Sequence, residues 1–282
     1  MNKIKPQFKA DVSETLLIPL YVRANESKER NPIINDHISE EILSKVDYDF
    51  SKFQADKRCQ YCISLRTRYL DNVLTNFVSQ YNDAVVVIVA CGLDPRIERV
   101  GIKKAFQTYE IDFPDVINFR RRLLPESPQN IYIAGNVLDY KWITTIKQRH
   151  SKGHFLFLLE GIAMYLTEEQ VKSIFQAIDD NFDNAEIHIE RMNKFMSQRT
   201  ERNKSVKETK AAFAWGCDNP REVEVWTNSF QLKDEYYYYA QDFSHLCQRV
   251  GAQMALLNLL PRFKRSFGIW SYEKRDTCSH IA

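Results

Sequence analysis

Short runs of continuous apolar residues, separated by stretches with helical spacing, constrain the fold of this chain more than any other feature. The runs are AVVVIVACG at 84–92, NIYIAG at 130–135, HFLFLLEG at 154–161 and AEIHIERM at 185–192. Strands with continuous Val, Ile or Leu are buried on both faces of a sheet, whereas half-exposed strands alternate apolar and polar residues. The intervening stretches, such as TEEQVKSIFQAIDDNF at 167–182, have the spacing of amphipathic helices. The pattern therefore predicts an α/β protein with a mostly parallel sheet and helices on both faces.

The rest of the chain is expected to belong to the same single domain, residues 1–282, because no repeat or low-complexity linker interrupts it. A polar segment with helical spacing precedes the core, a basic and aromatic segment without clear period follows it, and we expect the latter to be a lid over the substrate. The last part is predicted to hold one helix and two strands, AQMALLNLL and FGIWSYEKR. The four parts are the helical extension 1–82, the α/β core 83–190, the lid 191–242 and the closing segment 243–282.

Glycine is scarce, and this excludes the common phosphate-binding loops. The chain has 8 glycines where average usage of about 7% would supply roughly 20, and no two of them form GxG. The dinucleotide fingerprint GxGxxG and the GxxxxGK[ST] loop both need closely spaced glycines. The net charge of +2 gives no electrostatic reason to expect binding to nucleic acid or to an anionic membrane.

The cysteines and the first residues predict a cytoplasmic protein with free thiols. No apolar segment of signal-peptide type follows the basic start, and no apolar run approaches the roughly 20 residues of a membrane helix. Cys59 and Cys62 form a CxxC, but they lie in a stretch with helical periodicity and no second pair completes a set of four ligands. We therefore expect two helix residues and no metal site.

Chemistry is expected where the parallel strands end, because ligands of open α/β sheets bind outside the carboxyl ends of the strands. Gly92 follows the first strand, Asp112 closes the second, QTYEID, and Glu160 follows the fourth. An acidic residue at the second strand end can accept hydrogen bonds from both hydroxyls of a ribose, although Asp112 before Phe113-Pro114 also suits a turn. A carboxylate such as Glu160 at the end of an apolar strand needs a partner. With no cationic phosphate ligand among them, these residues indicate a nucleoside without phosphates.

Five blocks in order carry a resemblance to a known family. They are YVRA at 21–24 with NPI and Asp36, LRTRYLD at 65–71, the glycine block from Val87 to Arg96, EIDFP at 110–114, and EGIAMYL at 160–166. In these blocks the chain resembles the leucine carboxyl methyltransferase family, and within it the bacterial branch of polyketide O-methyltransferases of the tetracenomycin type. The resemblance covers about residues 15–190.

The resemblance implies a fold, a cofactor and the residues that hold it. The fold would be the seven-stranded, Rossmann-like sheet of class I methyltransferases, and the cofactor S-adenosylmethionine. Arg66 would pair with the methionine carboxylate of the cofactor, with Arg23 as a second candidate, and Glu160 would approach its amino group.

The same resemblance places the nucleoside end of the cofactor. Gly92 would lie against it, Asp112 would bind the ribose hydroxyls, and Asn136 and Val137 would flank the adenine. The family usually has Gly where this chain has Ala90, and Asp-Leu where it has Asn136-Val137. Ala90 adds one methyl group beside the ligand, and Asn136 can still offer its amide to adenine.

The residues on the acceptor side are predicted less specifically. Tyr165 and His188 are candidate catalytic residues, and Trp215, Trp226 and the tyrosines 236–239 are candidates for the wall of an organic acceptor site. Packing of the lid on the core explains the aromatic residues equally, and His188 between Ile187 and Ile189 can simply fill a strand position. A carboxylate acceptor is already ionised at pH 7 and needs no base, whereas a phenol or alcohol needs one.

Three functions follow from these expectations. The first is an S-adenosylmethionine-dependent O-methyltransferase acting on a small organic carboxylate, phenol or alcohol, as in polyketide or other secondary metabolism. The second is a protein C-terminal carboxyl methyltransferase, and the third is a non-catalytic binding module with the same fold. The sequence gives no prediction of the oligomeric state.

Overall fold

A seven-stranded sheet forms the centre of the molecule in a computed structural model, which describes residues 3–53, 56–104, 106–200, 206, 209, 211–227 and 229–274. The strand order is β3-β2-β1-β4-β5-β7-β6; β1 to β5 run parallel and β7 is antiparallel to both of its neighbours. The predicted mostly parallel α/β sheet is confirmed. The strands are β1 Ala84–Val89, β2 Gln107–Asp112, β3 Asn130–Ala134, β4 His154–Leu159, β5 Asn184–Met192, β6 Phe230–Tyr237 and β7 Phe267–Lys274.

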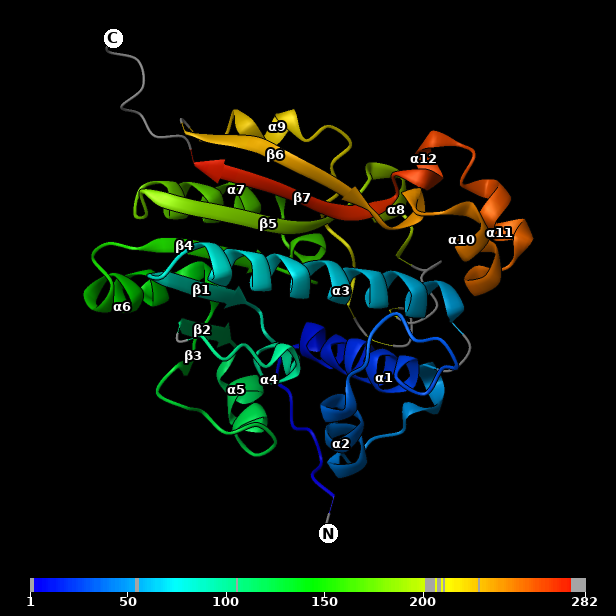
Figure 1. Ribbon diagram of the computed structural model, residues 1–282, viewed down its shortest axis with the longest axis horizontal. Helices are drawn as coiled ribbons and strands as arrows, with labels where there is room; N and C mark the ends of the chain where they lie inside the picture. The colour runs from blue at the N-terminus through cyan, green and yellow to red at the C-terminus, as the bar shows by residue number, and fades with distance from the viewer. Residues whose placement is uncertain are drawn as a thin grey trace.

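Helices cover both faces of this sheet, as the apolar runs predict. The long helix α3 crosses the near face in Figure 1, and α6 and α7 pack on the opposite face. The main helices are α1 Leu17–Glu26, α2 His37–Lys45, α3 Lys57–Gln80, α4 Arg96–Val100, α5 Pro114–Arg121, α6 Lys141–Arg149, α7 Glu168–Asp179 and α10 Phe243–Val250. The shorter ones are η1 Asp11–Leu16, η2 Phe50–Phe53, η3 Val137–Asp139, η4 Ala163–Tyr165, α8 Lys194–Ser197, α9 Arg221–Glu224, η7 Tyr238–Ala240, α11 Ala252–Leu257 and α12 Pro261–Lys264.

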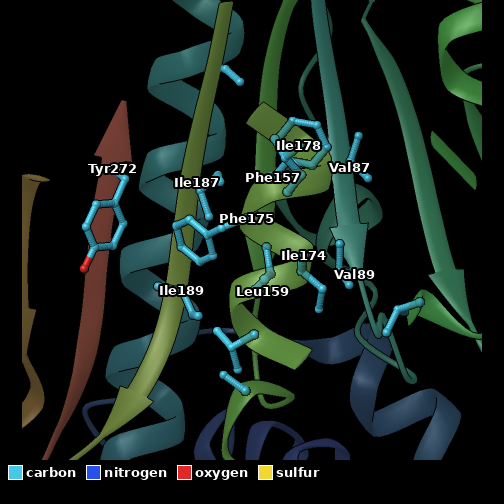
Figure 2. Close-up of a cluster of buried hydrophobic side chains, with 14 of the residues drawn as sticks. Val87, Val89, Phe157, Leu159, Ile174, Phe175, Ile178, Ile187, Ile189 and Tyr272 are labelled. Carbon is cyan, nitrogen blue, oxygen red and sulfur yellow. The ribbon is translucent and has the colours of Figure 1, made fainter. Parts of the chain in front are cut away.

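The central strands show why their residues are continuously apolar. In β1, Val87 and Val89 pack on the side of α6 and α7, whereas Val86 and Ile88 pack on the side of α3. Figure 2 shows the first of these two cores, in which Phe175 of α7 lies among side chains of the strands. Alternate residues of one strand thus enter two different cores, and each core requires an apolar side chain.

Two features of the helices bear on the sequence predictions. Cys59 and Cys62 lie in α3, as the helical periodicity around them predicts. Among the described residues, no helix is long and apolar enough to cross a bilayer.

The N-terminal helices pack against the loop that follows β1. A Cβ atom added to Gly92 would lie 3.2 Å from the Cβ of Leu16, so this close approach favours glycine. Arg23 of α1 donates to the carbonyl oxygen of Leu93 (3.2 Å) and lies 3.8 Å from the carboxylate of Asp94. The helical extension therefore covers the carboxyl ends of the strands, where the sequence predicts the ligand.

The prediction for the C-terminal third was wrong in two places. AQMALLNLL is the helix α11 and a following turn, in which Leu256 and Leu259 are 55% and 70% exposed. The strand comes instead from residues 230–237, inside the predicted lid, and forms the edge strand β6. A short apolar run does not distinguish a strand from a helix, and an edge strand with one open side tolerates the polar residues of QLKDE.

Ala90, where the family usually has glycine, has a left-handed backbone with φ of +59°. This conformation costs a residue with a Cβ roughly 1–2 kcal/mol, and glycine avoids that cost while losing more entropy on folding. We expect Ala90→Gly to raise the free energy of unfolding by about 1 kcal/mol, measured by urea denaturation. Ala84→Gly, in the buried and extended part of β1, is the control and should lower it; equal effects of the two changes would contradict the argument.

Candidate functional site

A pocket of about 610 Å³ lies at the carboxyl ends of the parallel strands, and residues of the N-terminal helices form part of its wall. Its wall combines the loops after β1, β2, β3 and β4 with residues of η1, α1 and α3. Sequence segments more than 100 residues apart therefore meet at one edge of the sheet. The lining includes every residue that the sequence predicted for cofactor binding: Arg23, Arg66, Ala90, Gly92, Asp112, Asn136, Val137 and Glu160.

Asp112, the last residue of β2, is held in place by two backbone groups. Its Oδ2 accepts a hydrogen bond from the N–H of Gly92 (2.8 Å) and its Oδ1 accepts one from the N–H of Phe113 (2.8 Å). Carboxylate oxygens accept more than one hydrogen bond each, so two further donors can be bound. Burial raises the pKa of Asp112 to about 6, against the lowering effect of these two bonds.

Arg120, which sequence reasoning did not single out, anchors the loop after β1 from below. It is fully buried and donates to the carbonyl oxygens of Gly92 (3.2 Å) and Asp94 (2.9 Å). The same guanidinium lies 2.5 Å from the carboxylate of Glu110, which is also fully buried. Burial raises the pKa of Glu110 to about 7, and Arg120 opposes that rise.

Arg66 of α3 lies between two carboxylates on the pocket wall. Its Nε is 2.7 Å from Glu160 Oε1, and its Nη1 donates to Glu190 Oε2 at 2.7 Å. Its Nη2 makes no hydrogen bond to a described residue, so this end of the fork remains for a ligand. A guanidinium with a free edge in a pocket suits a ligand carboxylate.

Glu160 and Arg23 also belong to a wider set of ion pairs. Glu160 forms a second ion pair with Arg96, and Arg96 also pairs with Asp71 (2.8 Å). Arg23 is 2% exposed and donates to Asp36, the N-cap of α2, at 3.1 Å. Its Nε and Nη2 are bonded to protein groups and its Nη1 lies 3.8 Å from Asp94, so Arg23 has less room for a cofactor carboxylate than Arg66 has at Nη2.

Asn136 and Val137 begin η3 after β3. Asn136 is exposed, and its Oδ1 accepts a hydrogen bond from the N–H of Leu138 (3.0 Å), which leaves its amide nitrogen as the available donor. Val137 is buried, and its carbonyl oxygen accepts a hydrogen bond from the indole of Trp142 (2.9 Å). The core thereby holds this loop at the pocket.

The two predicted acceptor-side residues have different positions. Tyr165, in η4, lines the pocket, and burial raises the pKa of its hydroxyl to about 12. His188 is not part of the pocket wall; it lies within β5, where its Nδ1 is 2.7 Å from Ser271 Oγ of the paired strand β7. His188 thus lies outside the pocket wall, beside Ser271 and Tyr69 on the face of the sheet that α3 covers, and its catalytic role stays a prediction.

The aromatic residues of the predicted lid divide in the same way. Tyr238 and Tyr239 line the pocket, whereas Trp215 and Trp226 pack in the core beside α7. Apolar residues that were not predicted as site residues also line the pocket. They include Leu16, Ile63, Met164, Met192, Met196 and Phe213.

The residues present fit S-adenosylmethionine, the cofactor that the resemblance implies. The described lining contains six carboxylates (Asp11, Asp56, Asp94, Asp112, Glu160 and Glu190) and three guanidiniums (Arg23, Arg58 and Arg66). A negatively charged wall suits a ligand with a sulfonium, an ammonium and a single carboxylate. The volume is that of a pocket for a small organic ligand, and Asp112 retains acceptor sites for a ribose.

Sequence reasoning missed Glu190, which completes the wall together with Tyr238. Glu190 accepts hydrogen bonds from Arg66, from the N–H of Gly161 (2.8 Å) and from the hydroxyl of Tyr238 (3.0 Å). One signal was present: a glutamate inside the apolar strand AEIHIERM requires a buried partner.

The model of the leucine carboxyl methyltransferase family matches residues 17–179 of the chain. Among proteins of known name, the chain is 28% identical over 225 residues to the tetracenomycin polyketide synthesis O-methyltransferase TcmP of Streptomyces glaucescens, covering 80% of this chain and 82% of that protein. It is 26% identical over 244 residues to the S-adenosyl-L-methionine-dependent methyltransferase dpfgK of Gibberella zeae, covering 79% and 81%.

Solved structures show the same fold at low sequence identity. A DUF574 family protein from Streptomyces avermitilis aligns with a TM-score of 0.57 and 8% identity, over 94% of this chain and 100% of that one. An S-adenosylmethionine-dependent methyltransferase from Anabaena variabilis aligns with a TM-score of 0.50 and 10% identity, over 98% and 99%.

Proposed function

The chain belongs to the leucine carboxyl methyltransferase family and is an S-adenosylmethionine-dependent methyltransferase, and we propose that it methylates an oxygen atom of a small, largely apolar organic acid. The observation that carries this proposal is the mixed wall of one pocket, in which charged residues such as Arg66 and Asp112 are combined with many apolar side chains. The O-methyltransferase TcmP, to which the chain is similar over four fifths of its length, is consistent with an oxygen acceptor.

Four of the polar residues in the wall have cofactor roles that their contacts permit. Arg66 would bind the methionine carboxylate through Nη2, and Glu160 would face the amino group. Asp112, fixed by two backbone N–H groups, would accept hydrogen bonds from the ribose, and Asn136 would donate its amide to the adenine. When bound, the cofactor supplies an electrophilic methyl group for an in-line displacement.

The apolar residues of the wall can position the acceptor and exclude water. Leu16, Ile63, Met164 and Phe213 provide this surface, and a dry, well-oriented site accounts for most of what such a displacement needs. Tyr165 keeps its proton at pH 7, since its pKa is raised to about 12, so it acts as a hydrogen-bond donor and not as a base.

The lack of a histidine base in the described lining favours a carboxylate over a neutral hydroxyl as the acceptor. Among the described residues that line the pocket there is no histidine, and Tyr165 is protonated. A carboxylate reaches the pocket already ionised and needs no general base, whereas an alcohol does.

Transfer of a labelled methyl group tests the proposed function. The protein is incubated with methyl-labelled S-adenosylmethionine and, separately, with aromatic carboxylic acids, phenols and peptide C-termini. We expect label on the carboxylic acids that is lost on treatment with base, which marks an ester. Base-stable label on phenols would replace the carboxylate by a hydroxyl acceptor, and label confined to peptides would overturn the small-molecule proposal.

Asp112→Ala is expected to weaken binding of S-adenosylmethionine by about 1–3 kcal/mol, because two hydrogen bonds to the ribose are lost. In the wild type, affinity should fall about tenfold from pH 7 to pH 5, since Asp112, with a pKa of about 6, is then largely protonated. Isothermal titration calorimetry measures both effects. Asp115→Ala, in the first turn of α5 and outside the pocket wall, is the control, and a pH dependence that survives in Asp112→Ala would assign it to another group.

A further inference from the structure

Glu190 is a pocket-lining carboxylate that the proposed cofactor contacts do not use. It lies on β5, is 5% exposed, and accepts hydrogen bonds from Arg66 Nη1 (2.7 Å), Gly161 N (2.8 Å) and Tyr238 Oη (3.0 Å). A buried carboxylate with three donors is firmly oriented. The position of its carboxylate in the pocket wall is therefore fixed.

The ion pairs around Glu190 leave that charge uncompensated. Arg66 is shared between Glu190 and Glu160, and Glu160 also shares Arg96 with two further carboxylates. Among the described residues, the connected set contains five carboxylates (Asp36, Asp71, Asp94, Glu160 and Glu190) and four guanidiniums (Arg23, Arg66, Arg96 and Arg99). The set therefore has one excess negative charge, and without the charge of Glu190 it would be neutral.

We propose that Glu190 is a specificity-determining residue, whose charge makes the pocket bind the cationic cofactor more tightly than the neutral product that remains after methyl transfer. S-adenosylmethionine has a net charge of +1, from its sulfonium, ammonium and carboxylate. Transfer forms a bond from the methyl carbon to the acceptor oxygen, and the electron pair of the broken carbon–sulfur bond stays on sulfur, so S-adenosylhomocysteine has a net charge of zero. A set of ion pairs with one excess negative charge, to which Glu190, Glu160 and Arg66 of the pocket wall belong, distinguishes these two ligands, which otherwise differ by a single methyl group.

The inference rests on the proposed function, in which Arg66 and the other charged residues of the pocket wall bind the cofactor. Glu190 has the position for it, because it contacts both Arg66 and the backbone of Gly161, next to Glu160. Its effect differs from that of a residue that only supports the wall. Loss of support lowers the affinity for both ligands equally. Loss of the charge lowers the affinity for the cationic S-adenosylmethionine alone.

Glu190→Gln separates charge from support. The amide oxygen can accept the hydrogen bonds of Arg66 and Gly161, and the amide nitrogen can donate to the hydroxyl oxygen of Tyr238, so all three contacts have an equivalent. Only the charge is removed. Glu190→Met is a second neutral variant of similar length, in which Arg66 keeps Glu160 as its ion-pair partner.

The test compares the dissociation constants of S-adenosylmethionine and S-adenosylhomocysteine by isothermal titration calorimetry at pH 8. Burial raises the pKa of Glu190, and a pH above neutrality is therefore chosen to favour its ionised form. We expect the preference for the cation to fall about tenfold in Glu190→Gln, with little change for the product, while thermal unfolding confirms that the variant is folded. If Glu190→Gln does not fold, the same measurement on Glu190→Met decides.

Two control variants keep the charge of Glu190 and change its surroundings. Glu186→Gln removes a carboxylate of the same strand that pairs with Lys233 (2.9 Å), outside the pocket wall. Tyr238→Phe removes one hydrogen bond to Glu190. Both should keep the wild-type preference for the cation.

The outcomes distinguish this inference from the proposed function. An equal loss of affinity for both ligands in the neutral variants, or an unchanged ratio, would overturn the role of Glu190 and leave the cofactor site in place. Failure of the wild type to bind either ligand would remove the proposed site itself.

Discussion

Replacing Arg66 by methionine should lower the free energy of unfolding by about 3–5 kcal/mol at pH 8, because two carboxylates in a nearly water-free wall lose their shared partner. Glu160 retains Arg96, but Glu190 keeps only the N–H of Gly161 and the hydroxyl of Tyr238. Urea denaturation measures the change, provided that the dependence of the unfolding free energy on urea concentration is the same in both proteins. The same variant should lose most of its affinity for S-adenosylmethionine, since the guanidinium edge at Nη2 is removed.

The pH dependence of this loss has a definite sign. Burial raises the pKa of Glu190, and Arg66 opposes that rise, so the pKa is higher still in Arg66→Met. A raised pKa in the folded state means that protonation favours folding, and the destabilisation should therefore shrink as the pH falls from 8 toward 5. Arg121→Met is the matched control: its pair with Glu126 is 40% and 35% exposed, and its loss should cost less than about 1 kcal/mol. A loss that small for Arg66 would contradict the buried pair.

Replacing Arg120 by methionine should have an effect of the same size, about 3–5 kcal/mol at pH 8, because Glu110 is left as an unpaired charge between the sheet and α5. The loop after β1 also loses the two donors that hold the carbonyl oxygens of Gly92 and Asp94. We therefore expect weaker cofactor binding together with the loss of stability, measured by calorimetry and by urea denaturation.

A second change tests whether the unpaired charge is the cause. Arg120→Met with Glu110→Gln should recover much of the stability, because no buried charge remains, but not the cofactor affinity, because the loop stays unanchored. Glu110 in the wild type has a pKa raised from 4.5 to about 7, so its protonation favours folding; this contribution is present below about pH 4.5 and is lost as the pH rises through 7. Recovery of neither property would indicate that packing of Arg120, and not its charge, is what matters.

The sequence was sufficient for the residues at strand ends. Gly92, Asp112 and Glu160 could be placed together because parallel strands end at one edge of the sheet, and all three line the pocket. The resemblance added Arg66, which no strand-end argument reaches, since α3 brings it in from the N-terminal extension. These predictions depend on local pattern or on a motif.

The remaining parts of the site depend on long-range packing. Glu190 and Tyr238 meet across 48 residues because β5 and η7 converge at the pocket, and no spacing in the sequence expresses that. His188 was a reasonable candidate by residue type, but the pairing of β5 with β7 places it against Ser271. The strand β6 was missed because an edge strand needs only one partner and tolerates polar side chains.

The position of β7 has a consequence for how the chain is made. β7 follows β6 in the chain but lies between β5 and β6 in the sheet, and α10, α11 and α12 separate the two in sequence. On the ribosome, β6 emerges before β7, which is its only partner among the described strands. The edge of β5 that pairs with β7 also stays open during this interval. An open strand edge pairs readily with another chain, so we expect the incompletely synthesised protein to be more prone to aggregation than the complete one.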